Sequence, residues 1–194
     1  MAAEPDITKW DIQTGDGDCG EAVVGMCNAV TQHLDTPLFE SGDLFPILDA
    51  IGDGIEEIGG TLGAIIAIIV ASFTSALKTS YAKSPDSFQA NTEETSKAAG
   101  EALRNLMTYT GARVGGRTVM DTLIPFCEEF EKSRDLYSAV KQAVAGAEKT
   151  EGMGAKFGRA TYLAEDKMDS ATPMDPGAWA AAVFLRGLGE GFAS

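Results

Sequence analysis

The sequence is poor in the residues that support several common kinds of catalysis. It has a single histidine, His33, so it lacks the Ser-His or Cys-His pair that nucleophilic catalysis requires. Its three cysteines, Cys19, Cys27 and Cys127, form no CxxC spacing. An odd cysteine count, together with an N-terminus that lacks the apolar core of a secretion signal, predicts a cytoplasmic protein with reduced thiols.

Basic residues are also scarce. The chain has 15 Lys and Arg against 29 Asp and Glu, which gives a net charge of −14. A surface this acidic repels nucleic-acid backbones and anionic membranes, so neither is an expected partner. It would also repel ATP, unless a metal ion or a local basic group reverses the field. Any nucleotide site in this chain therefore needs cations.

One stretch has no charge at all. Residues 59–77 contain no Asp, Glu, Lys or Arg, and this length reaches the range of a membrane span. The dense apolar part runs only from Ala64 to Phe73, however, and glycines and threonines dilute the remainder. No basic cluster flanks the stretch on one side. We expect a buried core helix rather than a membrane segment.

Alternation of apolar and polar residues over a strand length is absent, whereas apolar spacings of three and four recur throughout. The pattern predicts an all-α protein, with Asp43 and Asp175 as helix N-caps and a polar loop over 79–96. Short connections favour an antiparallel up-and-down bundle or helical barrel. We expect one domain over 1–194 with about seven helices, over 23–34, 44–58, 64–77, 99–107, 119–130, 136–144 and 176–188.

The clearest chemical feature is an Asp-rich, Gly-rich segment near the start. Asp11, Asp16 and Asp18 lie within eight residues, interleaved with glycines. Carboxylates are the hard oxygen ligands that Mg²⁺ and Ca²⁺ prefer, and glycines allow the turns that bring such ligands together. An EF-hand is excluded, because no glutamate stands at the closing position. The segment predicts either a metal site or an acidic turn that caps the next helix.

Three further segments carry glycine, arginine or a helix start. Glycines at 59, 60 and 63 open the apolar helix, where exposed N–H groups could hold phosphate or where two helices could pack closely. Residues 111–118 carry two arginines, suited either to phosphate or to surface ion pairs. Residues 158–163 contain Arg159, which suits phosphate or a structural ion pair, and Asp175-Pro176-Gly177-Ala178 can be simply a helix start.

The order and spacing of these segments resemble one family. Gly-Asp-Gly-Asp-Cys-Gly, then Gly-Gly-Thr-x-Gly-Ala, Gly-x-Arg-Thr-x-x-Asp, Gly-Arg-Ala-Thr-Tyr-Leu and Asp-Pro-Gly-Ala form the motif series of the C-terminal nucleotide-binding domain of dihydroxyacetone kinases. The similarity covers essentially the whole chain and looks closest to the single-chain, ATP-using eukaryotic enzymes of fungal type. It implies an antiparallel α-barrel of eight helices with ATP or ADP bound at one end.

The resemblance also implies a set of site residues. Asp11, Asp16 and Asp18 match the aspartates that hold two Mg²⁺ ions bridging the phosphates. Thr110 and Val119 match positions that line the adenine end. The full set of matching nucleotide-binding positions is Cys19, Gly20, Glu21, Gly60, Thr61, Leu62, Thr110, Arg117, Thr118, Val119, Arg159, Asp175, Pro176 and Gly177. The pattern assigns no side chain a role as catalytic nucleophile.

The chain also departs from the family pattern. Leu62 replaces a usual Ser, Gly116 a usual Asp, and Val119 a usual Met. The stretch from Ala164 to Met174 is a few residues longer than usual. Because only ten residues precede Asp11, we expect the family's first helix to be missing, which agrees with a count of seven rather than eight.

The implied function is half of a kinase. The resemblance implies Mg-ATP binding by this chain and phosphoryl transfer to a small keto-sugar held by a separate domain or subunit, with little activity alone and no exclusion of a homodimer. One alternative is a stand-alone barrel with a non-kinase binding role. Another is FAD-AMP lyase activity, which forms cyclic FMN at the same nucleotide site.

Overall fold

The chain forms helices and turns throughout the described residues. The computed structural model describes residues 2–32, 34, 36–162 and 172–193, and these contain nine α-helices, two short 3-10 helices and no strand. The all-α class is therefore confirmed. Contacts divide the chain into two compact units, residues 1–21 with 110–194 and residues 22–109. Whether the chain acts as the single domain expected from its length stays a prediction.

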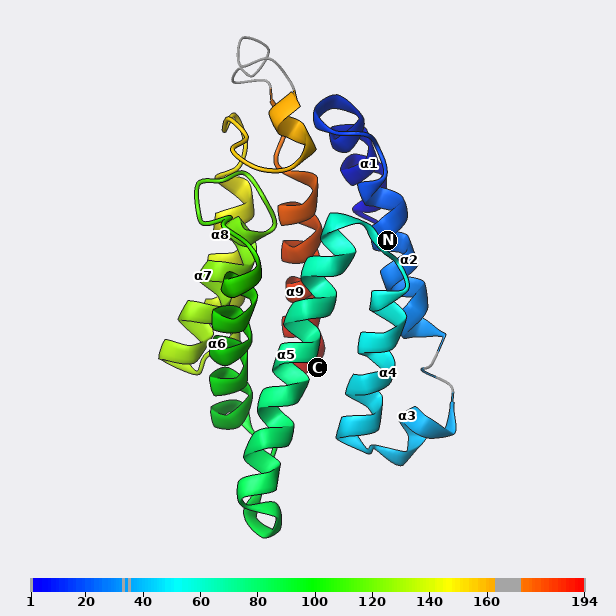
Figure 1. Cartoon of the computed structure of the whole chain (residues 1–194), viewed down its shortest axis with the longest axis vertical. Coiled ribbons are helices and arrows are strands. Elements are labelled where there is room, and N and C mark those ends of the chain that lie inside the picture. The colour runs from blue at the N-terminus through cyan, green and yellow to red at the C-terminus, as the bar shows by residue number, and fades with distance from the viewer. Residues whose placement is uncertain (1, 33, 35, 163–171, 194) are drawn as a thin grey trace. The chain divides into compact units, whose positions relative to one another are not determined.

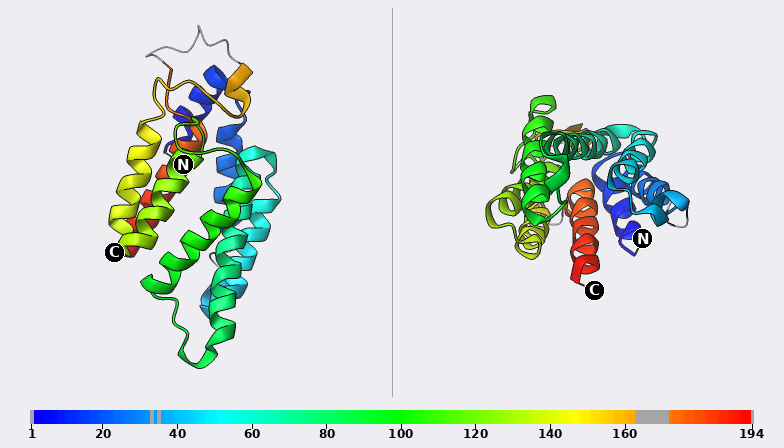
Figure 2. Two further views of the ribbon diagram at one scale, coloured as in Figure 1. Left: turned by 60° about the vertical axis from the view of Figure 1, so that its left-hand side comes forward. Right: turned by 90° about the horizontal axis from the view of Figure 1, so that it is seen from below.

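The first unit contains α1 (Glu4–Thr14), the start of α2 (Cys19–Thr31), α7 (Met120–Ser133), α8 (Leu136–Glu148), the 3-10 helix η2 (Arg159–Tyr162) and α9 (Pro176–Ala193). Helices α7 and α8 lie side by side and run in opposite directions, as the short connection between them predicts (Figure 1). Helix α9 packs against α8, α7 and α1. Figure 2 shows the same arrangement of α7, α8 and α9 from two other directions.

Small residues bring the helices of this unit close together. Ala147, Ala178 and Ala182 are almost completely buried where α8 meets α9. A Cβ on Gly146 would overlap the backbone carbonyl oxygen of Asp121, so only glycine lets α8 approach α7 at this point. The Thr122 hydroxyl donates a hydrogen bond to the Ala178 carbonyl at 2.8 Å and joins α7 to α9. The unit is thus closely packed around the start of α9.

The second unit contains the rest of α2, α3 (Pro37–Ser41), α4 (Leu44–Glu56), α5 (Gly60–Lys83), the 3-10 helix η1 (Pro85–Ser87) and α6 (Thr92–Tyr109). Helix α5 packs against α4 on one side and α6 on the other. The rings of Phe45, Tyr81 and Phe88 make mutual contacts at centroid distances of 5.4–6.0 Å, which ties the start of α4 to the end of α5.

Three expectations about the helices are corrected. The described residues hold nine α-helices rather than seven, because α1 and α3 were not predicted. The buried stripe of α1 is Ile7, Asp11 and Thr14, in which only one residue is apolar, so the apolar spacing gave no signal. The polar loop expected over 79–96 is also shorter, since α5 continues to Lys83 and α6 begins at Thr92. That the family's first helix is missing stays a prediction.

The apolar helix α5 is less buried than its composition predicts. Helix α5 is long and apolar enough to cross a membrane, because an 18-residue window within it has a mean hydropathy of 2.0. Only 17% of that window is buried, however. Its buried residues are Gly63, Thr74 and Leu77. The expectation of a buried core helix is therefore wrong for most of its length. The reason is that, within its unit, α4 and α6 pack against only part of the circumference of α5.

Candidate functional site: a carboxylate cluster and its buried support

The three aspartates of the Gly-rich segment converge in the structure. Asp11 lies near the end of α1, whereas Asp16 and Asp18 lie in the turn between α1 and α2. One carboxylate oxygen from each residue lies within 4.8 Å of the other two. Asp11 is buried, and the other two aspartates are exposed. The turn therefore presents one fixed and two accessible carboxylates at the same point.

Glycines allow this turn to close. Gly17 has a φ of +84°, in the left-handed region that side chains other than that of glycine rarely adopt. Gly15 lies so close to Asp11 that a Cβ in its place would overlap Oδ1 of that carboxylate. The two glycines therefore have different roles: Gly17 provides a backbone conformation, and Gly15 leaves space for a candidate ligand oxygen.

The Asp11 carboxylate also has a structural role. Its Oδ2 atom accepts a hydrogen bond of 2.9 Å from the backbone N–H of Cys19, the first residue of α2. The acidic turn thus caps the following helix, as one of the two sequence interpretations proposed. This does not exclude the other interpretation, because a carboxylate has several lone pairs and its Oδ1 atom remains on the side of Gly15.

The cluster fits a hard divalent cation. Oxygen ligands at about 2.1 Å from Mg²⁺ place opposite ligands about 4 Å apart, so oxygens within 4.8 Å need only a small contraction. All three groups are carboxylates, and two of them are accessible to solvent, which leaves room for phosphate and water in the remaining positions. Asp11, Asp16 and Asp18 therefore have the chemistry and spacing of a magnesium site.

Cys19 and Gly20 lie next to the cluster at the start of α2. Burial raises the pKa of the Cys19 thiol to about 12, and the carboxylates of Asp11, Asp175 and Asp18 add to the increase. The thiol is therefore protonated at neutral pH and is not a nucleophile. A Cβ on Gly20 would overlap the Thr8 hydroxyl, so this glycine lets α2 approach α1. Glu21, the third predicted contact of this segment, is exposed.

Arg117 is a completely buried charge close to the carboxylate of Asp175. Its side chain has no solvent exposure, and its backbone adopts a φ of +56°. One amino group, Nη2, donates to the carbonyl of Pro173 at 3.0 Å, and Nη1 lies 3.9 Å from Oδ1 of Asp175. Burial lowers the pKa of Arg117, while Asp175 and Asp11 oppose this shift. The guanidinium therefore lies within electrostatic range of both carboxylates.

Asp175 caps the last helix, as predicted. Its Oδ2 atom accepts a hydrogen bond of 2.8 Å from the backbone N–H of Ala178, and Pro176 is the first residue of α9. The Thr150 hydroxyl accepts from the Asp175 backbone N–H at 2.8 Å. Burial raises the pKa of Asp175 to about 6, and Asp121 and Asp11 add to the increase, whereas the Ala178 N–H and Arg117 oppose it.

Asp121 is a key residue of this site that the sequence analysis did not single out. It is 2% exposed, and its two carboxylate oxygens accept hydrogen bonds from the backbone N–H groups of Gly115, at 2.5 Å, and Thr118, at 2.8 Å. It therefore fixes the loop before α7 in which Arg117 lies. Its position three residues after Thr118, in the quoted motif, was a signal that could have identified it.

Several other predicted nucleotide contacts lie in or beside the loop before α7. Val119 is buried at the start of α7, and the Thr118 hydroxyl accepts from the Met120 N–H at 3.2 Å. The Thr110 hydroxyl accepts from the Ala112 N–H at 3.1 Å. The side chain of Arg159 and the residues 163–171 of the long connection lie outside the described part of the chain. That these residues and Gly177 contact a nucleotide stays a prediction.

Gly60, Thr61 and Leu62 belong to the second unit, at the start of α5. Gly59 and Gly60 both have a φ of +69°, and a Cβ on either would meet no atom within 4 Å. These two glycines therefore serve the backbone conformation at the helix start rather than a close helix contact. The interpretation of close packing is not supported at these two positions, and phosphate binding there stays a prediction.

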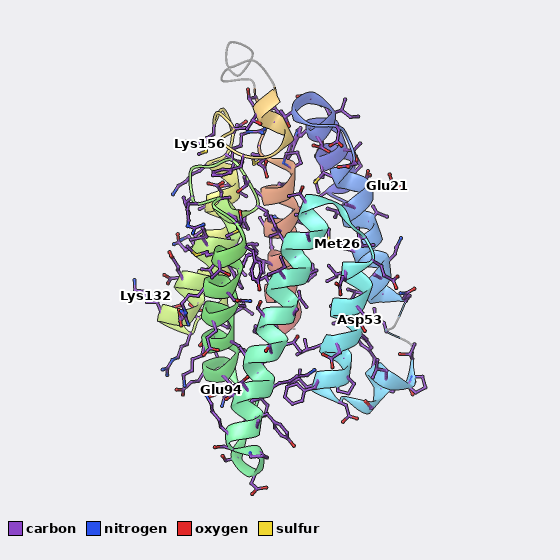
Figure 3. All side chains as sticks on the ribbon, viewed as in Figure 1. Glu21, Met26, Asp53, Glu94, Lys132 and Lys156 are labelled. Carbon is purple, nitrogen blue, oxygen red and sulfur yellow. The ribbon has the colours of Figure 1, made fainter. Side chains whose placement is uncertain are left out.

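The first unit also contains an aromatic residue beside the glycines of the loop. A Cβ on Gly116 would lie 3.2 Å from the Phe157 ring and 2.9 Å from the Arg113 carbonyl oxygen, and a Cβ on Gly111 would lie 3.8 Å from the same ring. The Lys156 N–H donates to the Gly116 carbonyl at 3.1 Å and holds Phe157 in place. Figure 3 labels Lys156 beside this loop. A side chain at position 116 would therefore meet both the Arg113 carbonyl oxygen and the Phe157 ring.

Comparisons with known proteins identify the family of this chain. Residues 13–190 match the DAK2 domain family. The chain is 40% identical over 189 residues to dihydroxyacetone kinase 1 of Saccharomyces cerevisiae and 37% identical over 198 residues to dihydroxyacetone kinase of Komagataella pastoris. These alignments cover 97% and 99% of this chain but only 31% and 32% of the two relatives. The chain therefore spans about a third of their length.

More distant relatives and a solved structure extend the comparison. Triokinase/FMN cyclase of Rattus norvegicus is 30% identical over 203 residues, which cover 98% of this chain and 32% of that protein. The crystal structure of the dihydroxyacetone kinase from C. freundii, in complex with AMP-PNP and Mg²⁺, superposes with a TM-score of 0.71 and 23% identity. The superposition covers 98% of this chain and 31% of the C. freundii kinase, which shows that the two share a fold. The chain belongs to the DAK2 domain family.

Proposed function

We propose that this chain binds Mg-ATP through Asp11, Asp16 and Asp18. The observation that carries the proposal is the convergence of these three carboxylates within 4.8 Å in a member of the DAK2 domain family. The solved relative binds AMP-PNP and Mg²⁺, which supports the choice of nucleotide and metal. Two ions are the number we propose, from the resemblance to the kinases.

The charges of the chain make a cation necessary at this site. A protein with a net charge of −14 repels a polyphosphate. When bound, Mg²⁺ supplies the positive charge that neutralises phosphate oxygens in the ground state and in the transition state. The first-turn N–H groups of Gly20 and Glu21 have no acceptor within their helix and are suited to phosphate oxygens. Arg117 lies within electrostatic range of the buried carboxylate of Asp11 and of the half-buried carboxylate of Asp175.

Calorimetric titration with ATP, with and without Mg²⁺, tests this proposal. We expect binding that requires the metal and that disappears in the variant Asp16→Ala with Asp18→Ala. The charge-matched control is Asp6→Ala with Asp86→Ala, because both of these aspartates are exposed and neither belongs to the cluster. Binding of ATP that is independent of Mg²⁺, or that survives in the Asp16 and Asp18 variant, would contradict the proposed site.

We further propose that the chain supports phosphoryl transfer to a small keto-sugar such as dihydroxyacetone. Because the relatives are about three times longer, the acceptor is assigned to a separate domain or subunit. We expect little turnover of dihydroxyacetone by the chain alone, and turnover when the remaining part of the yeast relative is added. An ATP-consumption assay on both samples tests this. Rapid turnover by the isolated chain would show that the acceptor does not require a separate domain or subunit.

A second candidate function is cyclic FMN formation from FAD. The observation that favours it is the similarity to triokinase/FMN cyclase, which covers 98% of this chain, although at a lower identity (30%) than the two yeast kinases. Incubation of the chain with FAD and a divalent metal, followed by chromatography for AMP and cyclic FMN, tests it directly. A stand-alone binding role, suggested by Leu62 and Gly116, would instead leave both assays negative.

The remaining parts of the proposal concern location and assembly. We propose a cytoplasmic protein, on the basis of its three cysteines without CxxC spacing and its similarity to metabolic kinases. The high negative charge supports the absence of nucleic-acid and anionic-membrane partners. A homodimer is compatible with the proposal, and sedimentation of the purified chain would measure it.

A further inference from the structure

We propose that Phe157 stacks on the base of the bound nucleotide. This inference rests on the proposed nucleotide site and assigns the residue that would recognise the base. Phe157 is 40% exposed and lies in the connection between α8 and η2, beside the loop before α7. An aromatic ring with one side supported and the other open to solvent is the surface on which nucleobases stack.

The support beneath the ring is specific. Ring carbons of Phe157 lie beside Gly111 and Gly116, two positions that have no side chain to hold the ring away from the backbone. The Lys156 N–H donates a hydrogen bond to the Gly116 carbonyl, which joins the residue next to Phe157 to this loop. Asp121 holds Gly115 and Thr118 on either side of Gly116 and Arg117. The ring therefore lies on a platform that exists before any ligand binds.

The position of the ring relative to the carboxylates also fits. Arg117 follows Gly116 directly in the chain, and its Nη1 atom lies 3.9 Å from Oδ1 of Asp175, a predicted nucleotide contact. The Phe157 ring lies beside Gly116, so the ring and Asp175 both adjoin the segment of Gly116 and Arg117 within one unit. A nucleotide has its phosphates at one end and its base at the other. With the phosphates at the carboxylates, the base would extend along this loop toward the ring.

The rest of the loop surface is consistent with an apolar planar ligand. Val114 is 59% exposed and lies between the two glycines that flank the ring. The Arg113 guanidinium donates to the carbonyls of Thr110 and Ala112 at 2.8 and 2.7 Å, which holds its charge against the loop backbone. The loop that carries Gly111 and Gly116 therefore also presents an exposed apolar side chain.

The test compares Mg-ATP with Mg-tripolyphosphate, which has the phosphates without a base. In Phe157→Leu, which keeps an apolar side chain on the loop, we expect Mg-ATP to bind at least about fivefold more weakly, the low end of base–aromatic stacking. Affinity for Mg-tripolyphosphate should not change. Phe157→Trp should bind Mg-ATP as well as the unmodified chain. Phe184→Leu is the matched control, because Phe184 is an exposed phenylalanine of α9 in the same unit.

The outcomes separate the two proposals. If Phe157→Leu weakens both ligands equally, or neither, Phe157 only supports the loop and stacking is wrong, while the metal–phosphate site stands. If the unmodified chain binds tripolyphosphate as tightly as ATP, the base is not recognised and stacking is again wrong. If the unmodified chain binds neither ligand with Mg²⁺, the proposed function itself fails, and the stacking proposal fails with it.

Discussion

The Nη1 atom of Arg117 lies 3.9 Å from the Oδ1 atom of Asp175, in a position where the arginine side chain has no contact with solvent. The Nε and Nη1 atoms of this arginine have no hydrogen-bond partner in the described part of the chain. The two charged groups therefore lie close to each other, but two nitrogen atoms of the arginine make no hydrogen bond to the described residues. A buried arginine of this kind contributes through the carboxylates that it neutralises, so its removal leaves a carboxylate without a cation.

Replacing Arg117 with Met should destabilise the protein at pH 7. The change keeps an unbranched side chain but leaves the buried carboxylate of Asp175 without its cation, for which a loss of about 3 kcal/mol is typical. Urea denaturation measures the difference in the free energy of unfolding. Adding Asp175→Asn to Arg117→Met should restore part of the loss, because the uncompensated charge is then removed. A double variant no more stable than Arg117→Met would argue against this pairing.

The pH dependence of stability should carry the signature of Asp175. Its folded pKa is raised to about 6, above the unfolded value of 3.8, so the folded state holds the proton more tightly. The resulting stability is fully present below pH 3.8 and is lost as the pH rises through 6, by up to about 3 kcal/mol. Asp175→Asn keeps the helix cap and removes the titration. The difference between the two unfolding curves from pH 4 to 7 should show this decline.

Replacing Gly15 with Ala should impair metal binding with little change elsewhere. The new Cβ would overlap Oδ1 of Asp11, so this carboxylate must move away from the cluster. We expect the affinity for Mn²⁺, followed by its electron paramagnetic resonance signal, to fall by about tenfold or more. Gly187→Ala is the matched control, because a Cβ there meets no atom within 4 Å. Equal Mn²⁺ affinities in the two variants would show that Asp11 is not a ligand.

Replacing Gly146 with Ala should destabilise the contact between α7 and α8. The added Cβ would overlap the Asp121 carbonyl oxygen and would lie 3.0 Å from the Pro125 ring, so the helices must separate. Overpacking of this kind costs about 1–3 kcal/mol. Thermal unfolding measures the loss. The same substitution at Gly187, in an open position of α9, should leave stability unchanged or raise it, since alanine favours helix more than glycine.

Much of the fold could be predicted from the sequence, because α2 and the helices from α4 onwards have apolar residues at helical spacing. The predicted starts at Leu44 and Pro176 agree with the structure. Helix α1 could not be found in this way, since the buried positions Asp11 and Thr14 are polar. The burial of α5 was overestimated because composition describes a helix but not how many neighbours cover it.

The three aspartates of the candidate site could be predicted from the sequence, but the buried residues that support them could not. Glycines between Asp11, Asp16 and Asp18 indicated that the carboxylates would converge, and they do. Nothing in the spacing indicated that Arg117 would be completely buried or that Asp121 would hold its loop, because both depend on contacts between distant segments. Phe157 was likewise missed, since one aromatic residue in a glycine-rich connection has no periodic pattern.

The hydrogen bond from the Cys19 N–H to Asp11 has a consequence for how an ion would be taken up. Because this bond already closes the turn between α1 and α2, the ordering entropy of the ligand loop is lost during folding and not during ion uptake. Affinity for the metal should then respond to remote changes in the α1–α2 hairpin, such as a side chain at Gly20 that presses against Thr8. A change that loosens the hairpin would thus weaken ion binding, and a bound ion would stabilise the hairpin.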